Sequence, residues 1–131
     1  NNWPVLRYAD ILLMYAEALN EISYNPNGEA FNMLNAVRLR AGLPPKTHNN
    51  ENETYRIMSQ QDFRIAIEQE RRVELAFEGH RWFDLIRTDR FVEVMSNLGF
   101  SVEAYESILP IPLVEIDKNP DGLWQNPGYI Q

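Results

Sequence analysis

Apolar positions recur at a helical spacing near the start of the chain. Between Leu6 and Ile22, one set falls at intervals of three and four residues, and a second set is offset from it around the helix. The first set is Leu6, Ala9, Leu12, Leu13, Ala16 and Leu19 or Asn20, and the second is Ile11, Met14, Ala18 and Ile22. Because a helix with two apolar faces is normally buried on two sides, we expect a doubly covered helix over 6–22, with Pro4 suited to the first turn.

A second helix follows a dense turn signal at 24–28. Its core positions are expected at Ala30, Phe31, Leu34, Val37 and Ala41. Gly42 suits the left-handed residue after a helix, and the prolines at 44 and 45 prevent continuation. We therefore predict a helix over 29–41 and a helical hairpin over 4–42. The hairpin has the size of one tetratricopeptide unit, but no second copy is visible in the sequence.

The next stretch, 43–59, is polar and predicts a surface loop. Ser59 and Asp62 then resemble a capping box, which favours a helix over 60–78 that Gly79 ends in a left-handed conformation. The side chains predicted on the inner side of this helix are Phe63, Ala66, Ile67, Glu70, Val73 or Glu74, and Phe77.

Two shorter helices are predicted over 82–87 and 90–98, and the pattern changes beyond them. Leu-Pro-Ile-Pro at 109–112 cannot lie inside a helix, and Asn-Pro turns follow. We expect 99–131 to form an irregular strap over a helical body. The predicted organisation is one all-α region, 1–131, made of the hairpin, the loop, helices within 60–98 and the strap.

Composition and charge exclude several classes of function. The formal net charge is −7 and cysteine is absent, which disfavours a nucleic-acid partner and excludes disulfides and thiolate metal sites. His48 and His80 lack the helical partner spacing of a zinc site, so we predict no metal and no cofactor. No apolar run is long enough to span a bilayer.

Acidic residues recur at Glu70, Glu74 and Glu78, four residues apart. A pair of carboxylates could act as acid and base in glycoside hydrolysis, and this is the enzymatic hypothesis for Glu70 and Glu74. Arginines are interleaved with the acids along the same helix, which favours ion pairing instead. We therefore predict no catalytic residue.

Aromatic side chains near turns are the other candidate binding groups. Trp124 and Tyr129 lie in the predicted strap, where they could stack on sugar rings or anchor the strap to the helical body. The sequence leaves both interpretations open.

Five stretches, taken together and in order, resemble the C-terminal region of SusD-like (RagB/SusD) proteins. They are RYADILLMYAEALNE at 7–21, LNAVRLRAGLP at 34–44, ERRVELAFEGHRWFDLIR at 70–87, LPIP at 109–112 and QNPGY at 125–129. They leave out mainly 46–59 and 91–106.

The resemblance implies a largely helical protein with tetratricopeptide-like pairs, lipid-anchored on the outer face of the outer membrane. Such proteins bind glycans or other nutrients without cleaving them, and they cover a SusC-type TonB-dependent transporter that imports the ligand. We expect this chain to be the C-terminal part of such a protein, with the anchor and the main sugar-stacking aromatics elsewhere. No binding residue is therefore carried over from the family.

The shared motifs are interpreted as structural. The residues expected to join the helices through ion pairs are Glu17, Arg38, Arg40, Glu70, Arg71, Glu74, Glu78, Arg81 and Asp84. This predicts a scaffold; the alternative is an interaction module that docks on the transporter or on the N-terminal part. Because apolar surface would remain exposed without that part, we also expect self-association.

Overall fold

The computed structural model describes residues 5–130. Within this range it contains helices and no β-strand. The α-helices are α1 (Tyr8–Ile22), α2 (Glu29–Arg40), α3 (Gln60–Glu74), α4 (His80–Arg87), α5 (Phe91–Asn97) and α6 (Leu113–Lys118), and the 3-10 helices are η1 (Glu53–Tyr55) and η2 (Ala104–Ser107). The all-α prediction is confirmed. Pro4 lies outside the described residues.

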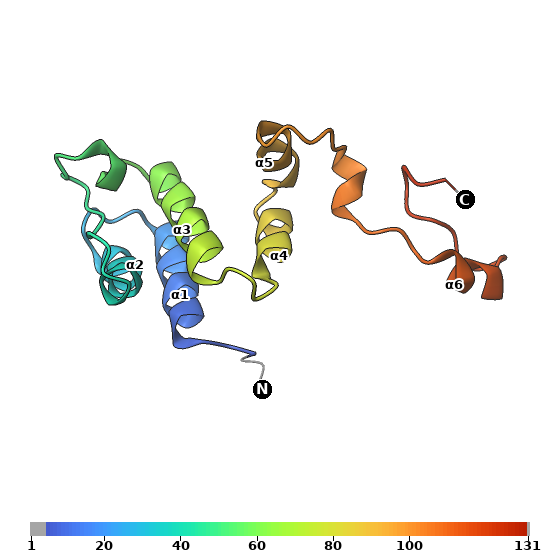
Figure 1. Ribbon diagram of the computed structural model, residues 1–131, viewed down its shortest axis with the longest axis horizontal. Helices are drawn as coiled ribbons and strands as arrows, with labels where there is room; N and C mark the ends of the chain where they lie inside the picture. Colours follow the sequence, from blue (N-terminus) through green and yellow to red (C-terminus); the bar gives the residue numbers. More distant parts are fainter. Residues whose placement is uncertain (1–4, 131) are drawn as a thin grey trace. The chain divides into compact units, whose positions relative to one another are not determined.

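The chain divides between Arg81 and Trp82 into two compact units, here called the N-terminal and C-terminal units. Helices α1, α2 and α3 belong to the N-terminal unit, where α1 packs against both of the others (Figure 1). The C-terminal unit contains α5, η2 and α6.

Helix α1 begins at Tyr8, two residues later than predicted, because Arg7 is in an extended conformation. At the other end of the hairpin, Gly42 takes a positive φ of 74°, and the amide of Leu43 donates to the carbonyl of Arg38. This bonding pattern ends α2 as its sequence predicted. The predicted core positions at the two ends, Leu6 and Ala41, lie outside the helices and are exposed.

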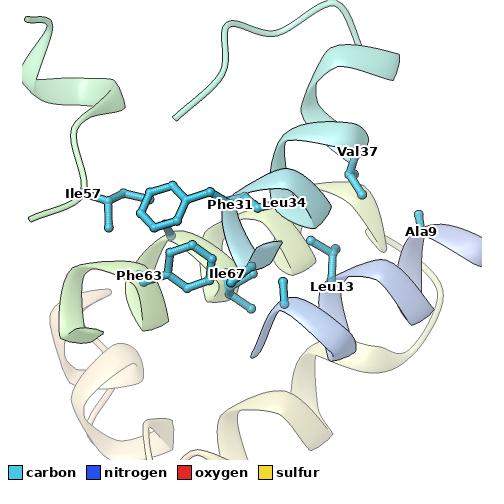
Figure 2. Close-up of a cluster of buried hydrophobic side chains, with 11 residues drawn as sticks. Ala9, Leu13, Phe31, Leu34, Val37, Ile57, Phe63 and Ile67 are labelled. Atoms are coloured by element: carbon cyan, nitrogen blue, oxygen red, sulfur yellow. The ribbon is translucent and has the colours of Figure 1, made fainter. Parts of the chain in front are cut away.

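The core of the N-terminal unit is formed where the three helices meet. Leu13, Leu34 and Phe63 are inaccessible to solvent, one from each helix. The rings of Phe31 and Phe63 lie 4.8 Å apart between centroids, tilted by 57°, and Figure 2 shows them next to each other. Burial of such side chains contributes about 1.5–3 kcal/mol each, which makes this cluster the main stabilising feature of the unit.

The second apolar set on α1 does not behave as predicted. Ile11, Met14 and Ile22 are 40%, 41% and 82% exposed, although α1 is packed against two helices. The reason is geometric, because α2 and α3 both cover the side of α1 that carries Leu13 and Ala16. The second set, which includes Ile11, therefore lies on a face of α1 that neither α2 nor α3 covers. No part of the described chain buries this face.

The loop over 43–59 is not wholly a surface loop, and this is a correction to the prediction. Ile57 is 1% exposed and joins the hydrophobic core beside Phe31 (Figure 2). Thr47 holds it there, since its amide donates to Tyr55 and its carbonyl accepts from Ile57. The few apolar residues of this polar run show no helical or strand periodicity, which is why the sequence pattern missed Ile57.

Helix α3 begins as predicted and ends early. The Ser59 hydroxyl accepts a hydrogen bond from the Asp62 amide, which confirms the cap. The helix stops at Glu74, so extending its period to residue 78 placed Phe77 wrongly. Phe77 is fully exposed with a φ of 66°, and Val73 is 59% exposed. Gly79 adopts the predicted left-handed conformation, with a φ of 82°.

Within the C-terminal unit, the strap is mostly irregular but includes the short helices η2 and α6. Gln125 fixes one of its bends, because its side-chain amide both accepts from the Ile111 amide and donates to the Ile111 carbonyl, each at 2.8 Å. Gly128 has a φ of 94°, and a Cβ atom there would collide with the ring of Tyr105. These contacts stabilise the strap locally where no helix is possible.

Candidate functional site

A buried ion pair in the N-terminal unit joins α2 to α3. Arg38 Nη1 donates to Glu70 Oε2 at 2.6 Å, and the two side chains are 8% and 7% exposed. Arg38 Nε also donates to the carbonyl of Pro44 at 3.0 Å, and its guanidinium lies over the ring of Tyr55. The Glu70 carboxylate is therefore held by a fixed cation inside the protein rather than presented to a ligand.

A second buried pair joins α1 to α3. Arg71 Nη1 donates to Asp10 Oδ1 at 2.6 Å, and both side chains are 6% exposed. Asp10 lies one turn before Leu13 on the face that α1 turns to its neighbours. Buried ions in such positions must be paired, because the desolvation cost of a single charge is several kcal/mol.

Arg7 connects the start of α1 to the end of α3. Its guanidinium donates to Glu78 Oε2 and to Glu74 Oε1, each at 2.9 Å, and to the Glu74 carbonyl at 2.6 Å. The hydrogen bonds from Glu78 and then Glu74 raise the pKa of Arg7 above its ordinary value. Arg40 of α2 also donates to the Glu74 carboxylate at 2.6 Å, so this group joins three segments.

Two further residues of the predicted ion-pair set pair with side chains nearer to them in sequence. Arg81 bonds Glu68 of α3 at 3.1 Å, and in the C-terminal unit Asp84 pairs with Arg87 at 2.9 Å. Glu17 lies on α1, half-buried. The structure thus pairs Arg38 with Glu70 and Arg40 with Glu74. Arg7 links Glu74 to Glu78.

Arg7 and Asp10 take part in the contacts between α1 and α3 but were not in the predicted set. Asp10 could have been found, since it is a lone acid on a face otherwise made of Ala9, Leu13 and Ala16. Arg7 gave no such signal, because its partners are 67 and 71 residues away in sequence.

The arrangement offers little to reaction chemistry. Glu70 and Glu74 each bond to arginine, with side chains 7% and 9% exposed, so neither faces a cleft as the glycosidase hypothesis requires. Among residues 5–130, no group of three or more His, Cys, Asp and Glu side chains could hold a metal ion. Over the same range, no helix has the length and apolar character needed to cross a membrane.

The two candidate sugar-stacking aromatics differ in their surroundings. The Tyr129 hydroxyl donates to the carbonyl of Ile108 at 2.9 Å, and its ring meets Tyr105 edge-on at 5.0 Å. Burial and then the nearby Glu106 raise the pKa of Tyr129. Trp124 instead is 63% exposed. Tyr129 is thus an anchor of the strap, whereas the Trp124 indole is accessible to a ligand.

Comparison with families of known proteins gives one match over nearly the whole chain. The family model described as the SusD family matches residues 1–129. Two SusD-like proteins of Formosa agariphila, P2 and P38, are 36% and 41% identical over 133 and 98 residues. These alignments cover 98% and 75% of this chain but 26% and 19% of the relatives. The chain therefore spans about a quarter of their length or less.

Solved structures give the same result. A SusD superfamily protein from Parabacteroides distasonis is 34% identical with a TM-score of 0.78, covering 98% of this chain and 27% of that one. A laminarin-binding SusD-like protein is 41% identical with a TM-score of 0.68, covering 95% and 23%. A SusD homologue from Bacteroides thetaiotaomicron has a TM-score of 0.71 at 35% identity, covering 97% and 27%.

Proposed function

Because this chain belongs to the SusD family, we propose that it is the scaffold part of a cell-surface protein that captures glycans for import without cleaving them. The observation that carries the proposal is the match over residues 1–129, which includes every helix of both units. SusD-like proteins are carbohydrate-binding and generally non-catalytic, and the proposal extends this property to the present chain.

The class of ligand is argued from one solved relative. The SusD-like protein that binds laminarin is 41% identical to this chain, and a β-glucan is therefore the first ligand to test. Trp124 is the candidate contact within the chain, since its exposed indole could stack on the apolar face of a sugar ring.

The scaffold role is supported by what the charged residues contact. Arg7, Arg38 and Arg71 join segments that are far apart in sequence. Arg38 and Arg7 also hold Glu70 and Glu74, the two carboxylates that the hydrolase hypothesis would need free. Such pairs specify how the helices meet more than they add net stability. The proposal therefore assigns no catalytic residue and no cofactor.

The position in the cell and the partner are further parts of the proposal, and the family supports them. We propose a lipoprotein at the outer face of the outer membrane, with a SusC-like TonB-dependent transporter as the partner that receives the glycan. The second candidate function is a pure interaction module that contacts the transporter or the rest of its own polypeptide. The exposed apolar residues of α1 favour this second function for the N-terminal unit.

The test is to incubate a longer polypeptide that carries this chain with laminarin and to follow both retention on the polysaccharide and release of reducing ends. We expect retention with no increase in reducing ends over a protein-free control. Trp124→Ala should weaken retention if the indole contacts sugar, whereas Phe100→Ala, an aromatic of the same unit with a similar exposure of 57% against 63%, serves as the matched control. Release of reducing ends that Glu70→Gln abolishes would overturn the proposal.

A further inference from the structure

The chain has two lysines, and they lie in different surroundings. Lys118 is exposed, and its Nζ atom lies 2.7 Å from the Glu115 carboxylate. Lys46 is half-buried in the loop between α2 and α3, and its Nζ atom donates to the carbonyl of Thr54 at 2.7 Å. Among the described residues, none places a carboxylate within ion-pair distance of this amine. An ammonium group at Lys46 therefore lacks the anionic partner that Lys118 has.

The backbone of Lys46 is fixed by its neighbours. Its amide donates to Asn35 Oδ1 and its carbonyl accepts from Asn35 Nδ2, each at 2.8 Å. The following amide, of Thr47, donates to the carbonyl of Tyr55, which brings the two sides of the loop together. The Lys46 amine is thus held at a defined place against Thr54 and Tyr55, rather than extending freely into solvent.

A second cation lies near this amine. Lys46 Nζ is 5.9 Å from the centroid of the Tyr55 ring, and the guanidinium carbon of Arg38 is 5.8 Å from the same centroid. Burial and then Arg38 lower the pKa of Lys46 below its ordinary value of 10.5, and Glu70 opposes them. A larger fraction of the Lys46 amine is therefore uncharged near neutral pH than in a free lysine.

These surroundings favour a particular chemistry. An uncharged lysine amine is a nucleophile, and desolvation or a neighbouring cation activates it for attack on a carbonyl group. The hydrogen bond to Thr54 is exposed, so a small reagent can reach Nζ. The same loop carries exposed carboxylates at Glu51 and Glu53, which disfavour negatively charged reagents. A small neutral aldehyde meets both conditions.

We propose that Lys46 is a modification site at which hydroxyaldehydes, the class that includes open-chain reducing sugars, form an imine. In this step Nζ bonds the aldehyde carbon, the carbon–oxygen bonds break, and the oxygen leaves as water with both protons of the amine. No oxidant or reductant is consumed. The inference goes beyond the proposed function and does not depend on it, because the site lies in the N-terminal unit and uses neither Trp124 nor a bound glycan.

The first experiment incubates this chain with glycolaldehyde and cyanoborohydride, which reduces the imine to a stable amine, and follows each lysine by peptide mass spectrometry. A synthetic peptide of residues 43–59 carries the same lysine without the fold. At neutral pH we expect Lys46 to react at least about threefold faster in the chain than in the peptide, because each unit of pKa changes the uncharged fraction about tenfold.

This advantage should shrink at higher pH, where the peptide amine loses its proton as well. Accessibility alone would give a ratio of rates that does not change with pH. A rate in the chain equal to or below that of the peptide at neutral pH, or a ratio independent of pH, would overturn the proposal.

The second experiment changes the charge beside the amine. Tyr55→Glu places a carboxylate there and should slow labelling of Lys46 by about threefold or more, whereas Tyr55→Gln, of similar size and uncharged, should retain most of it. Both variants remove the ring, so their difference isolates the charge. Labelling of Lys118 is the internal control and should be the same in both variants.

Circular dichroism checks that the variants fold. Thr54→Glu and Thr54→Gln, at an exposed position, provide a second matched pair should either Tyr55 variant unfold. Equal rates of Lys46 labelling in the glutamate and glutamine variants would contradict the assignment of Lys46 as an activated amine.

Discussion

Arg38 and Glu70 form an ion pair whose side chains are both more than nine-tenths buried. Removing one of the two charges should therefore lower the stability of the folded chain strongly. Replacing Arg38 with methionine would leave a carboxylate in the interior without its cation. We expect the free energy of unfolding in urea to fall by about 3–5 kcal/mol. The double variant Arg38→Met, Glu70→Met should recover most of this loss, because neither charge is then buried.

The matched control for this prediction is Arg40→Met, since Arg40 also bonds a glutamate of α3 but is 60% exposed. Glu74 would keep Arg7 as a partner. We therefore expect a loss of about 0–1 kcal/mol. A loss at Arg40 equal to that at Arg38, or a double variant as unstable as the single one, would contradict the interpretation of the buried pair.

Phe77 combines two unfavourable features, because its φ is 66° and its side chain is fully exposed. A left-handed conformation costs an L-residue about 1–2 kcal/mol, and glycine avoids this cost. Phe77→Gly should therefore stabilise the isolated chain by about 1 kcal/mol in thermal unfolding. Phe83→Gly, at a 70% exposed position inside α4, should destabilise it instead.

Individual ion pairs also show what sequence patterns cannot predict. The acids and arginines between 70 and 87 indicated ion pairing, but periodicity does not say which arginine reaches which acid. Arg71, for example, pairs with Asp10, which is 61 residues away in the sequence. Partners at that separation are determined by packing, so they become visible only in the folded structure.

Helix α3 is the element whose start the sequence predicted best. Ser59 caps it through a hydrogen bond of 3.1 Å from the Asp62 amide. Ser59→Ala removes that acceptor, and we expect a loss of about 1 kcal/mol in the free energy of unfolding. Ser59→Asp should retain most of the stability, and an alanine variant as stable as the parent would show that the cap contributes nothing.

A surface pair between α1 and α3 should make stability depend on pH. Arg64 hydrogen-bonds Glu21 at 2.7 and 2.6 Å and thereby lowers the pKa of that carboxyl below its usual value of 4.5. A depressed carboxyl pKa stabilises the folded state above 4.5, and the contribution disappears as the pH falls through the folded-state pKa.

The measurement is chemical denaturation of the parent chain and of Glu21→Gln at neutral pH and well below 4.5. The parent should be the more stable at neutral pH, and the difference should vanish in acid. Glu53→Gln, in an exposed pair confined to one loop, is the control. A difference that persists in acid would contradict the assignment to this ion pair.

The start of α3 and the end of α2 were predictable because local signals determine them. A capping serine and a left-handed glycine act within four residues, and both were observed where the sequence placed them. The end of α3 was not predictable in the same way, since four apolar or acidic residues continue its pattern beyond Glu74. There the chain turns because Arg7 holds Glu74 and Glu78 together.

The all-helical fold and the family could both be read from motifs spread along the chain. The division into two units could not, because no composition change marks the step from Arg81 to Trp82. Helix α4 runs continuously across that step. Unit boundaries depend on the distribution of packing in three dimensions, which the periodicity of one helix does not encode.

At the scale of the whole molecule, the proposal assigns the scaffold to this chain and most of the sugar contacts to the rest of the polypeptide. In this account the chain supports a glycan-binding protein through its ion-paired helices. Most of the sugar contacts would come from the polypeptide outside it. The chain aligns with 23% of the solved laminarin-binding relative, so three quarters of that relative remain to supply them.

The most direct test is a calorimetric titration of laminarin into this chain and, side by side, into a longer polypeptide that carries it. The account predicts saturable heat with the longer polypeptide and none with the chain alone. Binding by the chain alone, at an affinity equal to that of the longer polypeptide and lost in Trp124→Ala, would contradict the scaffold role and place the sugar site in the C-terminal unit.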